Sequence, residues 1–358
     1  MQPVGTATVY RRRGLASRLL VHHRGCTAWG GDPRGVGIVS RISGNVLITG
    51  GSGSLGQAIV ERGTREGWDA SFIVYSRDDA KHAPMRERFP SCRFVLGDVR
   101  DSETLAGALR GVDILIHAGA LKRVPEAEHD TAAYVGANVV GSMVVVREVL
   151  KAGVPRVIGI STDKASAPIG AYGQTKAIME RLFQAAATPF GPRFTLVRYG
   201  NVLASRGSVI PTLRAQVASG GPLTITDSKM TRFWITLDDA IDLIIAGLRI
   251  ESGQILIPKS RASSMAVLAE AIAPGHPIVQ VGGRGGERPH EQLLNELEAR
   301  YARDTGRFYQ LGPLWGTFVD ELPAGFRLGS ETATQFTTAE LRDVLARMDA
   351  GQTVRTIE

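Results

Sequence analysis

Tyr172 and Lys176 are the residues of this 358-residue chain whose types and spacing point most directly to chemistry. They form a Tyr-x-x-x-Lys pattern, and residues four apart on a helix lie on the same face. A lysine there can hold the ribose of a nicotinamide cofactor and lower the pKa of the phenol electrostatically. The tyrosinate would then take the proton of a substrate hydroxyl during hydride transfer. Because the pattern alone is common, its meaning depends on what precedes it.

A glycine triplet upstream has the spacing of a dinucleotide-binding turn. It follows a short apolar run at 46–48, which predicts a buried strand, and it opens a predicted helix over about 55–65. Glycine permits a tight turn and lets backbone N–H groups approach a pyrophosphate, which the helix N-terminus attracts. In this context the pattern predicts a cofactor-binding loop rather than an ordinary turn. The expected contacts are Gly50, Gly53, Ser54, Leu55 and Gly56.

Residues after the next predicted strands indicate which nicotinamide cofactor binds. An NAD site usually has an acid after the second strand, but this chain has Ser76 and Arg77. Arginine suits a 2′-phosphate, so NADP is expected rather than NAD, the alternative being that Arg77 is a solvated surface charge. Asp98 can accept from the adenine amino group, the alternative being a helix N-cap or a turn aspartate. Val99 and Ala118 complete the expected cofactor contacts.

Strand-like and helix-like segments alternate along the chain before Gly200. This order predicts an α/β fold with a doubly wound parallel sheet, the Rossmann arrangement, because the strands are apolar throughout. After Gly200 the pattern loosens, and a smaller C-terminal substrate-binding domain is expected at the carboxyl edge of the sheet. The predicted strands are 46–48, 71–75, 93–96, 113–117, 157–161 and 195–198. The expected divisions are a disordered basic tail over 1–43, an NADP-binding Rossmann domain over 44–200 completed by about 235–257, and a substrate-binding region over 201–234 and 258–358.

Positive charge is concentrated in residues 1–43, which hold seven arginines and one aspartate, a net +6 of the chain's +7. The rest of the chain has no basic excess, which argues against a nucleic-acid partner. The composition of the tail is similar to that of a transit peptide, but a disordered tail or an upstream translation start is the favoured interpretation. No apolar run is long enough to predict a signal peptide or a membrane span.

The cysteine and histidine content indicates the compartment and excludes a metal centre. Cys26 and Cys92 alone cannot build a disulfide framework or a zinc site. The seven histidines are scattered without metal-ligand spacing, so no metal is expected. A reducing, cytoplasmic location follows from these two observations.

Together these motifs resemble the extended short-chain dehydrogenase/reductase superfamily from residue 45 to about 350. Within it, the stretch 161–165, Ser-Thr-Asp-Lys-Ala, is similar to configuration-inverting UDP-N-acetylglucosamine 4,6-dehydratases of the polysaccharide-biosynthesis group. Other hexose dehydratases carry Thr-Asp-Glu at this place. Further agreement lies in VYSRD at 74–78, GDVRD at 97–101, ALKRVPEAE at 120–128, RYGNVLASRGSVIP at 198–211, MTRFWIT at 230–236 and RGGERPHE at 284–291.

The resemblance implies loss of water from a UDP-N-acetylhexosamine, with UDP-N-acetylglucosamine as the expected substrate. Tyr172 would take the C4 hydroxyl proton, and Lys176 and Thr162 would stand beside it. Lys164, neutral in a dry site, would remove the C5 proton, and a protonated Asp163 would release the C6 hydroxyl as water. Hydride return to C6 and reprotonation from the opposite face would invert C5. The alternative for Asp163 and Lys164 is a surface ion pair.

The same matching assigns further residues to the UDP-sugar, each of which by itself could be a surface charge: Lys122, Asn201, Arg206, Lys259, Arg284 and Glu287. Arg123 and Gly119 depart from the family's usual His and Ala, and 129–131 replaces Tyr-Asn-Pro, which leaves the hexose open. A C4/C5-epimerase and a 5,6-dehydratase on this scaffold are the alternatives. A non-catalytic NADP sensor is a third, against which the presence of Tyr172 and Lys176 argues. A homo-oligomer without a membrane partner is expected.

Overall fold

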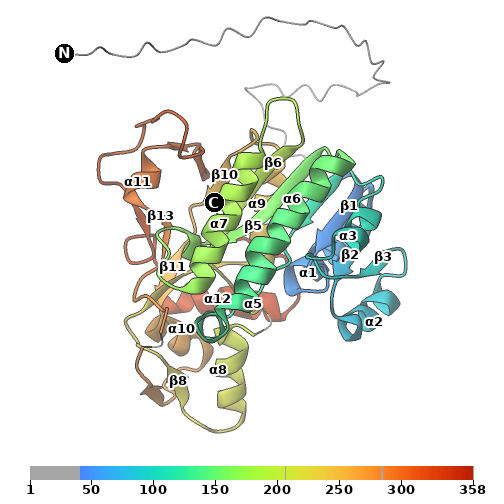
Figure 1. Ribbon diagram of the computed structural model, residues 1–358. Helices are drawn as coiled ribbons and strands as arrows, with labels where there is room; N and C mark the ends of the chain where they lie inside the picture. Colours follow the sequence, from blue (N-terminus) through green and yellow to red (C-terminus); the bar gives the residue numbers. More distant parts are fainter. Residues whose placement is uncertain (1–40, 206, 284, 358) are drawn as a thin grey trace, which may run out of the picture. The chain divides into compact units, whose positions relative to one another are not determined.

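The computed structural model describes residues 41–205, 207–283 and 285–357, and at their centre lies a nine-stranded sheet (Figure 1). Its order is β14-β15-β10-β6-β5-β4-β1-β2-β3, in which the strands from β10 to β3 run parallel. The parallel strands are β1 (Gly44–Thr49), β2 (Ala70–Ser76), β3 (Arg93–Leu96), β4 (Ile114–His117), β5 (Arg156–Thr162), β6 (Arg193–Tyr199) and β10 (Ile255–Pro258). The strand order reverses between β1 and β4, and ligands of such sheets bind in the crevice at this point.

Helices cover both faces of the sheet because alternate residues of its strands point to opposite sides. In β1, Leu47 joins an apolar cluster with Val145 and Phe183, whereas Val46 joins a second cluster on the other face. The first face carries α3 (Ser102–Ala108), α6 (Gly141–Ala152) and α7 (Ala171–Ala186). The second carries α1 (Ser54–Arg65), α2 (Asp79–Arg88) and α9 (Leu237–Gly247). The predicted doubly wound α/β sheet is therefore confirmed.

A smaller lobe with its own apolar cluster follows β6. The cluster brings together Leu213, Trp234 and Leu268 from segments far apart in the chain. Its helices are α8 (Val209–Ala218), α10 (Met265–Ile272) and α12 (Thr338–Asp349). Its short strands are β7 (Asn201–Val202), β8 (Leu223–Ile225), β9 (Thr231–Ile235), β11 (Ala262–Ser264) and β12 (Ile278–Gln280). A separate two-stranded sheet of β13 (Gln292–Leu294) and β16 (Leu328–Gly329) packs its leucines into the cluster on the first face of the central sheet. The short helix α11 (Glu296–Ala299) lies between β13 and β14.

The expected division at about residue 258 differs from the structure in one respect. Two strands from the segment assigned to substrate binding, β14 (Ala302–Asp304) and β15 (Phe308–Leu311), extend the central sheet beyond β10. They run antiparallel, β15 on β10 and β14 on β15. An antiparallel pair needs only a short connection, so its sequence lacks the strand–helix alternation by which the parallel strands were predicted.

The folded region also begins earlier than the predicted tail boundary. Ile42, placed in the tail, is only 2% exposed and belongs to the cluster that contains Val46 and Ile59. Residues 1–40 lie outside the described residues. The folded region therefore includes Ile42, because its side chain packs beneath α1 and β1.

The helical stretch Thr131–Ala152 is apolar enough to pass a length and composition test for a membrane span, with a mean hydropathy of 1.4. It consists of α5 (Thr131–Tyr134), a π-helical turn over Val135–Val140, and α6; the short α4 (Val124–His129) precedes it. Within its most apolar window, 56% is buried inside the protein. Core helices commonly pass this test, because their buried face is apolar. This stretch also exposes apolar side chains on its outer face, which raises its mean hydropathy further.

Candidate active site

A cavity of about 1620 Å³ follows the carboxyl ends of the parallel strands. The loops after β1, β2, β3, β4, β5 and β6 all contribute to its wall, as does the start of α7. Typical pockets for one small molecule measure roughly 300–1,000 Å³. The cavity therefore has room for two ligands, in the crevice where such sheets bind them.

The glycine loop shapes the end of the cavity at β1. Gly50 has φ +66°, and a Cβ there would lie 2.8 Å from the carbonyl oxygen of Ala118. Gly53 is the N-cap of α1, and a Cβ on it would lie 3.0 Å from the Gly50 carbonyl. Side chains at either position would fill the cradle that a pyrophosphate needs, so the loop fits a dinucleotide. Gly56 does not line the cavity; a Cβ there would be 2.3 Å from the Gly51 carbonyl, so it lets α1 pack on the loop.

The ends of β2 and β3 carry the residues predicted to read the adenosine. Ser76, Arg77, Asp98 and Val99 all line the cavity, and so does Ala118 after β4. One Arg77 nitrogen lies 3.3 Å from the Asp98 carboxylate. Arg100 adds two hydrogen bonds of 2.9 and 2.8 Å, foremost among the causes that lower the pKa of Asp98 to about 2.

The alternative helix N-cap role for Asp98 is wrong. The cap of α3 is Asp101, whose carboxylate accepts hydrogen bonds from the backbone N–H groups of Glu103 and Thr104. Asp98 instead accepts a bond from the backbone N–H of Arg100, two residues on, as a turn aspartate does, and it also faces the cavity. Its carboxylate is held charged between the guanidinium groups of Arg77 and Arg100.

The predicted chemical residues meet at the end of β5. Asp163 is 1% exposed, and its Oδ1 accepts hydrogen bonds from Thr162 Oγ1 at 2.9 Å and Lys164 Nζ at 3.2 Å. Its other oxygen, Oδ2, is buried without a hydrogen-bond partner. Lys164 Nζ also lies 2.9 Å from Glu291 Oε1, and Arg232 lies 3.9 Å from the same oxygen. Asp163 and Lys164 thus form part of a buried cluster, not a surface ion pair.

The charges in this cluster differ from the expectation of a neutral Lys164. Burial alone would lower the pKa of Lys164, but Asp163 and Glu291 together raise it above its ordinary value. Burial and Glu291 raise the pKa of Asp163, and Lys164 only partly opposes them. Burial favours a protonated Glu291, yet Lys164 and Arg232 hold its pKa below the usual range. In the protein without ligands, Lys164 is therefore an ammonium paired with the Glu291 carboxylate.

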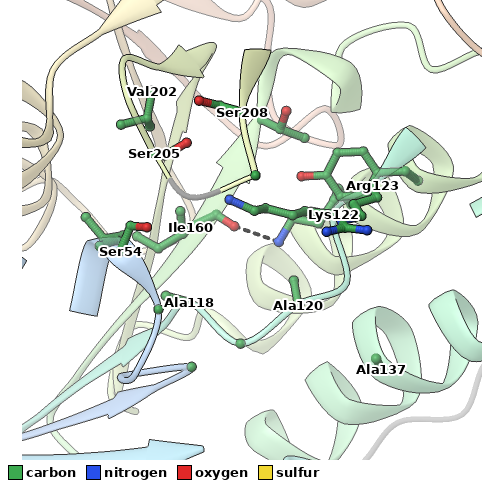
Figure 2. Close-up of a pocket in the computed structure, with 18 of the residues that line it drawn as sticks. Ser54, Ala118, Ala120, Lys122, Arg123, Ala137, Ile160, Val202, Ser205 and Ser208 are labelled. Atoms are coloured by element: carbon green, nitrogen blue, oxygen red, sulfur yellow. Dashed lines mark hydrogen bonds between the residues drawn. The ribbon is translucent and has the colours of Figure 1, made fainter. Parts of the chain in front are cut away.

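Tyr172 and Lys176 both line the cavity from α7. Burial raises the pKa of Tyr172 to about 12, while the Lys164 ammonium and a hydrogen bond with Thr162 lower it. Lys176 donates to the Ile160 carbonyl at 2.6 Å, a bond marked in Figure 2, and burial lowers its pKa to about 8. The cation that lowers the Tyr172 pKa is thus Lys164 and not, as the motif predicts, Lys176.

The residues predicted to bind the sugar nucleotide are only partly brought together. Lys122, Asn201 and Glu287 line the cavity, and Figure 2 shows Lys122 extending from the loop after β4 toward the side that carries Ser205 and Ser208. Lys259 is not in the cavity wall: its amine pairs with Asp304 at 2.8 Å and lies 4.9 Å from the Tyr309 ring centroid. Arg206 and Arg284 lie outside the described residues.

Buried polar atoms without partners mark the same cavity. Among the described residues, four of those in the cavity wall have such an atom. A polar atom that is buried and unpaired costs about 1–3 kcal/mol, so its presence indicates a missing partner. The four atoms are Asp163 Oδ2, Asn201 Oδ1, Ser208 Oγ and Glu287 Oε2.

Several cavity residues were missed at the level of the sequence. Glu291 is the most important, because it forms the ion pair with Lys164. It stands at the end of the RGGERPHE stretch, so the motif was recognised, but nothing in its spacing shows that its last residue meets β5. Arg232, within the MTRFWIT stretch, also lines the cavity, beside Glu291.

A family model described as "Polysaccharide biosynthesis protein" matches residues 46–313. Among curated proteins, an inverting UDP-N-acetylglucosamine 4,6-dehydratase of Campylobacter jejuni is 38% identical over 276 residues, which cover 75% of this chain and 83% of that protein. A UDP-glucose 4-epimerase of Rickettsia conorii is also 38% identical, over 283 residues, with the same two coverages. The chain is thus similar to both a dehydratase and an epimerase.

Solved structures with the same fold include a dehydratase. Pen from Bacillus thuringiensis superimposes with a TM-score of 0.78 at 28% identity, covering 85% of this chain and 98% of Pen. DesIV of Streptomyces venezuelae, a dTDP-glucose 4,6-dehydratase solved with NAD bound, gives a TM-score of 0.61 at 25% identity, covering 68% of this chain and 86% of DesIV. This chain is therefore similar in fold to a nucleotide-sugar dehydratase.

Proposed function

The chain belongs to the polysaccharide biosynthesis protein family, and on that premise we propose that it is an NADP-dependent UDP-N-acetylglucosamine 4,6-dehydratase that inverts C5. Its relatives are nucleotide-sugar dehydratases and epimerases of the short-chain dehydrogenase/reductase superfamily, so it is an enzyme with a nicotinamide cofactor. The observation that carries the finer proposal is the Asp163–Lys164 pair beside Tyr172. A dehydratase needs both an acid and a base near C5 and C6, and this pair supplies two titratable groups there.

The mechanism assigns one proton to each side chain. The bound cofactor would supply oxidation at C4 and later return hydride to C6. Tyr172 takes the C4 hydroxyl proton, which the Lys164 ammonium favours by lowering the Tyr172 pKa. Neutral Lys164 then removes the C5 proton, which the 4-keto group acidifies. Asp163, protonated because burial raises its pKa, gives its proton to the C6 hydroxyl, which leaves as water.

The return of hydride to C6 and the protonation of C5 would complete the reaction. C5 gains its proton from the face opposite Lys164, and the product is a 4-keto-6-deoxy sugar with inverted C5. Lys176 is assigned to the ribose of the cofactor, and Thr162 holds Tyr172 and Asp163. Lys122, Asn201, Arg206, Arg284 and Glu287 remain proposed contacts of the UDP-sugar. For Lys259, the pairing with Asp304 gives no support to such a role.

Lys164 must lose its own proton before it can act as the base. Two carboxylates lie close enough to take it, Glu291 at 2.9 Å and Asp163 at 3.2 Å. Asp163 has to keep a proton for the C6 hydroxyl, so we assign the Lys164 proton to Glu291. This transfer follows the loss of the C4 hydroxyl proton to Tyr172, and the exclusion of water by the bound substrate favours it, because a neutral pair costs less than two charges in a dry site.

Replacing Glu291 with glutamine is expected to move the pH profile toward alkali. In wild type the Lys164 proton passes to Glu291 within the pair, so neutral Lys164 forms without loss of a proton to solvent. In the variant that proton must leave to solvent, so the rising limb of kcat/KM follows the pKa of Lys164 itself, which Asp163 still raises, and the rate near neutral pH falls. Steady-state rates across pH measure this, with exposed Glu296→Gln as the control. A falling limb that shifts instead would show that Lys164 acts as an acid.

A C4-epimerase is the second candidate, because the Rickettsia conorii relative is as similar as the Campylobacter jejuni one. C4 epimerisation needs Tyr172 and the cofactor, but neither a base at C5 nor an acid at C6. It would leave the buried Asp163 Oδ2 and the Lys164–Glu291 pair without a task. The cluster at β5 therefore favours the dehydratase.

Incubation of the purified protein with UDP-N-acetylglucosamine separates the two candidates. The dehydratase gives a product lighter by one water, whose NMR spectrum has a C6 methyl group and no net reduced cofactor beside it. The epimerase gives UDP-N-acetylgalactosamine of unchanged mass. Tyr172→Phe serves as the inactive control, because it removes the proton acceptor for the first step in both reactions. A product of unchanged mass would reject the dehydratase.

Arg77 underlies the proposed preference for NADP, and Arg77→Ala is expected to weaken NADP⁺ binding with little effect on NAD⁺. A lost charge-assisted hydrogen bond costs about 1.5–3 kcal/mol, and we expect the lower end because the Arg77 side chain is 52% exposed. That loss is about tenfold in Kd. Fluorescence titration with both cofactors measures it, and Arg88→Ala, which breaks a pair with Glu61 outside the cavity, is the control. Equal losses for both cofactors would contradict the assignment.

We propose a homo-oligomer formed through α6 and α7, which lie side by side on one face of the sheet (Figure 1). Val135, Met143 and Leu150 expose apolar side chains seven or eight residues apart along one helix, and Ile178 adds another on α7. Such a stripe is typical of a helix that packs on a second copy. Between two copies, the stripe would be covered, and with it the exposed apolar side chains that raise the hydropathy of Thr131–Ala152.

A charge in the stripe should break the oligomer. Met143→Glu is expected to convert it to monomer, because an unpaired buried carboxylate cannot be tolerated at the interface. Sedimentation velocity measures the mass, and the exposed Leu297→Glu on α11 is the control. A monomeric wild type would reject the interface. A cytoplasmic location remains proposed, and the free thiol of Cys92 is consistent with it.

A further inference from the structure

Behind the adenosine end of the cavity lies a buried chain of three polar side chains. His82 of α2 is fully buried, and its Nε2 lies 2.6 Å from the hydroxyl oxygen of Ser76. The Ser76 hydroxyl in turn donates to Ser52 Oγ at 2.8 Å. Both serines line the cavity beside Arg77, whereas His82 does not reach it. The chain therefore connects an imidazole in the core with two hydroxyls in the cofactor wall.

The direction of these bonds fixes the protonation of the imidazole. A serine hydroxyl has one proton, and that of Ser76 goes to Ser52. Nε2 must then donate to Ser76, so His82 carries its proton on Nε2. Nδ1 is left as a buried acceptor without a hydrogen-bond partner. It is also the atom that would take a second proton.

The surroundings keep His82 neutral in the protein without ligands. Burial and Arg86 lower the pKa of His82, and Asp79 and Asp78 only partly oppose them. The other neighbours, Ser76 on β2, Ser52 in the glycine loop and the Phe94 ring on β3 at 5.4 Å, carry no charge. A dianion placed at the two serine hydroxyls would add an attraction that these groups lack.

We infer that His82 is a positioning residue for the adenosine 2′-phosphate. The imidazole of His82 takes up a proton when that phosphate binds. This inference rests on the proposed NADP specificity. His82 donates to Ser76 from behind, so that when the phosphate binds beside Arg77 the Ser76 proton turns from Ser52 to a phosphate oxygen. The 2′-hydroxyl of NAD has no charge, so it gives no reason for His82 to gain a proton. His82 thus couples pH to the choice between the two cofactors.

The test compares wild type with His82→Gln, whose amide can still donate to Ser76 but cannot titrate in this range. The Kd values for NADP⁺ and NAD⁺ are measured between about pH 5.5 and 8. The phosphate loses charge near pH 6 in both proteins, so only the ratio of wild-type to variant affinity reports His82. For NADP⁺ we expect this ratio to grow severalfold toward acid, because a rise of one pKa unit gives its full tenfold effect only below both pKa values. For NAD⁺ we expect it to stay constant.

A second measurement needs no variant. The imidazole NMR signal of His82 should titrate about one unit higher with NADP⁺ bound than with NAD⁺ bound or without cofactor. Parallel pH profiles of the two proteins, or an unmoved His82 signal in a protein that prefers NADP⁺, would overturn the inference and leave the cofactor proposal standing. A wild type that binds NAD⁺ as tightly as NADP⁺ would overturn both.

Discussion

Replacing Lys164 with methionine is expected to abolish dehydration while the protein still binds the nucleotide sugar. General-base catalysis contributes about 10²–10⁴-fold to a rate, and the Lys164 amine lies in the cavity wall 3.2 Å from Asp163 Oδ1. Methionine keeps most of the volume and lacks the titratable group. In deuterated water, wild type should place deuterium at C5 of the product and also exchange C5 of recovered substrate. The Lys164→Met variant should do neither, as mass spectrometry and NMR can measure.

Asp163→Asn is the matched control, because it changes the neighbouring residue and removes the proton that the C6 hydroxyl needs to leave as water. The amide cannot protonate the C6 hydroxyl, so dehydration should stop here too. Lys164 remains, however, so slow exchange of deuterium into C5 of recovered substrate should persist. The reverse pattern, exchange in Lys164→Met and none in Asp163→Asn, would exchange the two roles. Asp163, whose pKa is raised, would then be the base that removes the C5 proton.

Residues that lie next to one another along the chain were predictable, and residues that meet through the fold were not. The glycine loop, Ser76–Arg77 and Asp163–Lys164 each follow a strand directly, and parallel strands bring their carboxyl ends to one edge. A local pattern was therefore enough to place these residues in one cavity. The helix α2 escaped prediction because most of its ten residues are polar and because it includes Pro84, which disfavours a helix interior.

The charge state of Lys164 could not be predicted, because it depends on Glu291, which lies 127 positions later in the sequence. A lysine beside one carboxylate in a dry site can be neutral or charged. The second carboxylate, delivered by the segment before β13, decides in favour of the ammonium. Lys259 was predicted to contact the diphosphate, but its amine pairs with Asp304 of β14 outside the cavity. This pairing could not be predicted either, because Asp304 lies far from Lys259 in the sequence.

Arg198→Met is expected to be the most destabilising single change considered for this protein. Arg198 of β6 is fully buried and uses all five N–H groups: two on Glu180 of α7, two on Glu298 of α11 and one on the Leu293 carbonyl. It thereby ties the helix that carries Tyr172 to the segment that forms β13 and α11. Breaking a buried ion pair by removing one partner costs about 3–5 kcal/mol, because the remaining charges have no compensation. Urea denaturation measures the free energy of unfolding.

Two variants distinguish lost charge pairing from lost packing. Arg198→Lys keeps the charge but cannot form the double fork, so an intermediate loss is expected. Arg198→Met combined with Glu180→Gln and Glu298→Gln removes all the charges and should recover most of the stability. If the triple variant is as unstable as Arg198→Met, packing and not unpaired charge is responsible.

The pH dependence of the loss gives an independent check with a fixed sign. Arg198 helps to hold the pKa of Glu298 below its ordinary value, against the effect of burial. A carboxylate with a lowered pKa contributes stability above its unfolded pKa of about 4.3, and that contribution disappears as pH falls through the folded value. Without Arg198, burial raises the pKa of Glu298, which then takes up a proton at higher pH. The stability difference between wild type and Arg198→Met should therefore be largest near neutral pH and shrink toward pH 4. A difference that stays constant over this range would mean that the Glu298 charge does not underlie the loss.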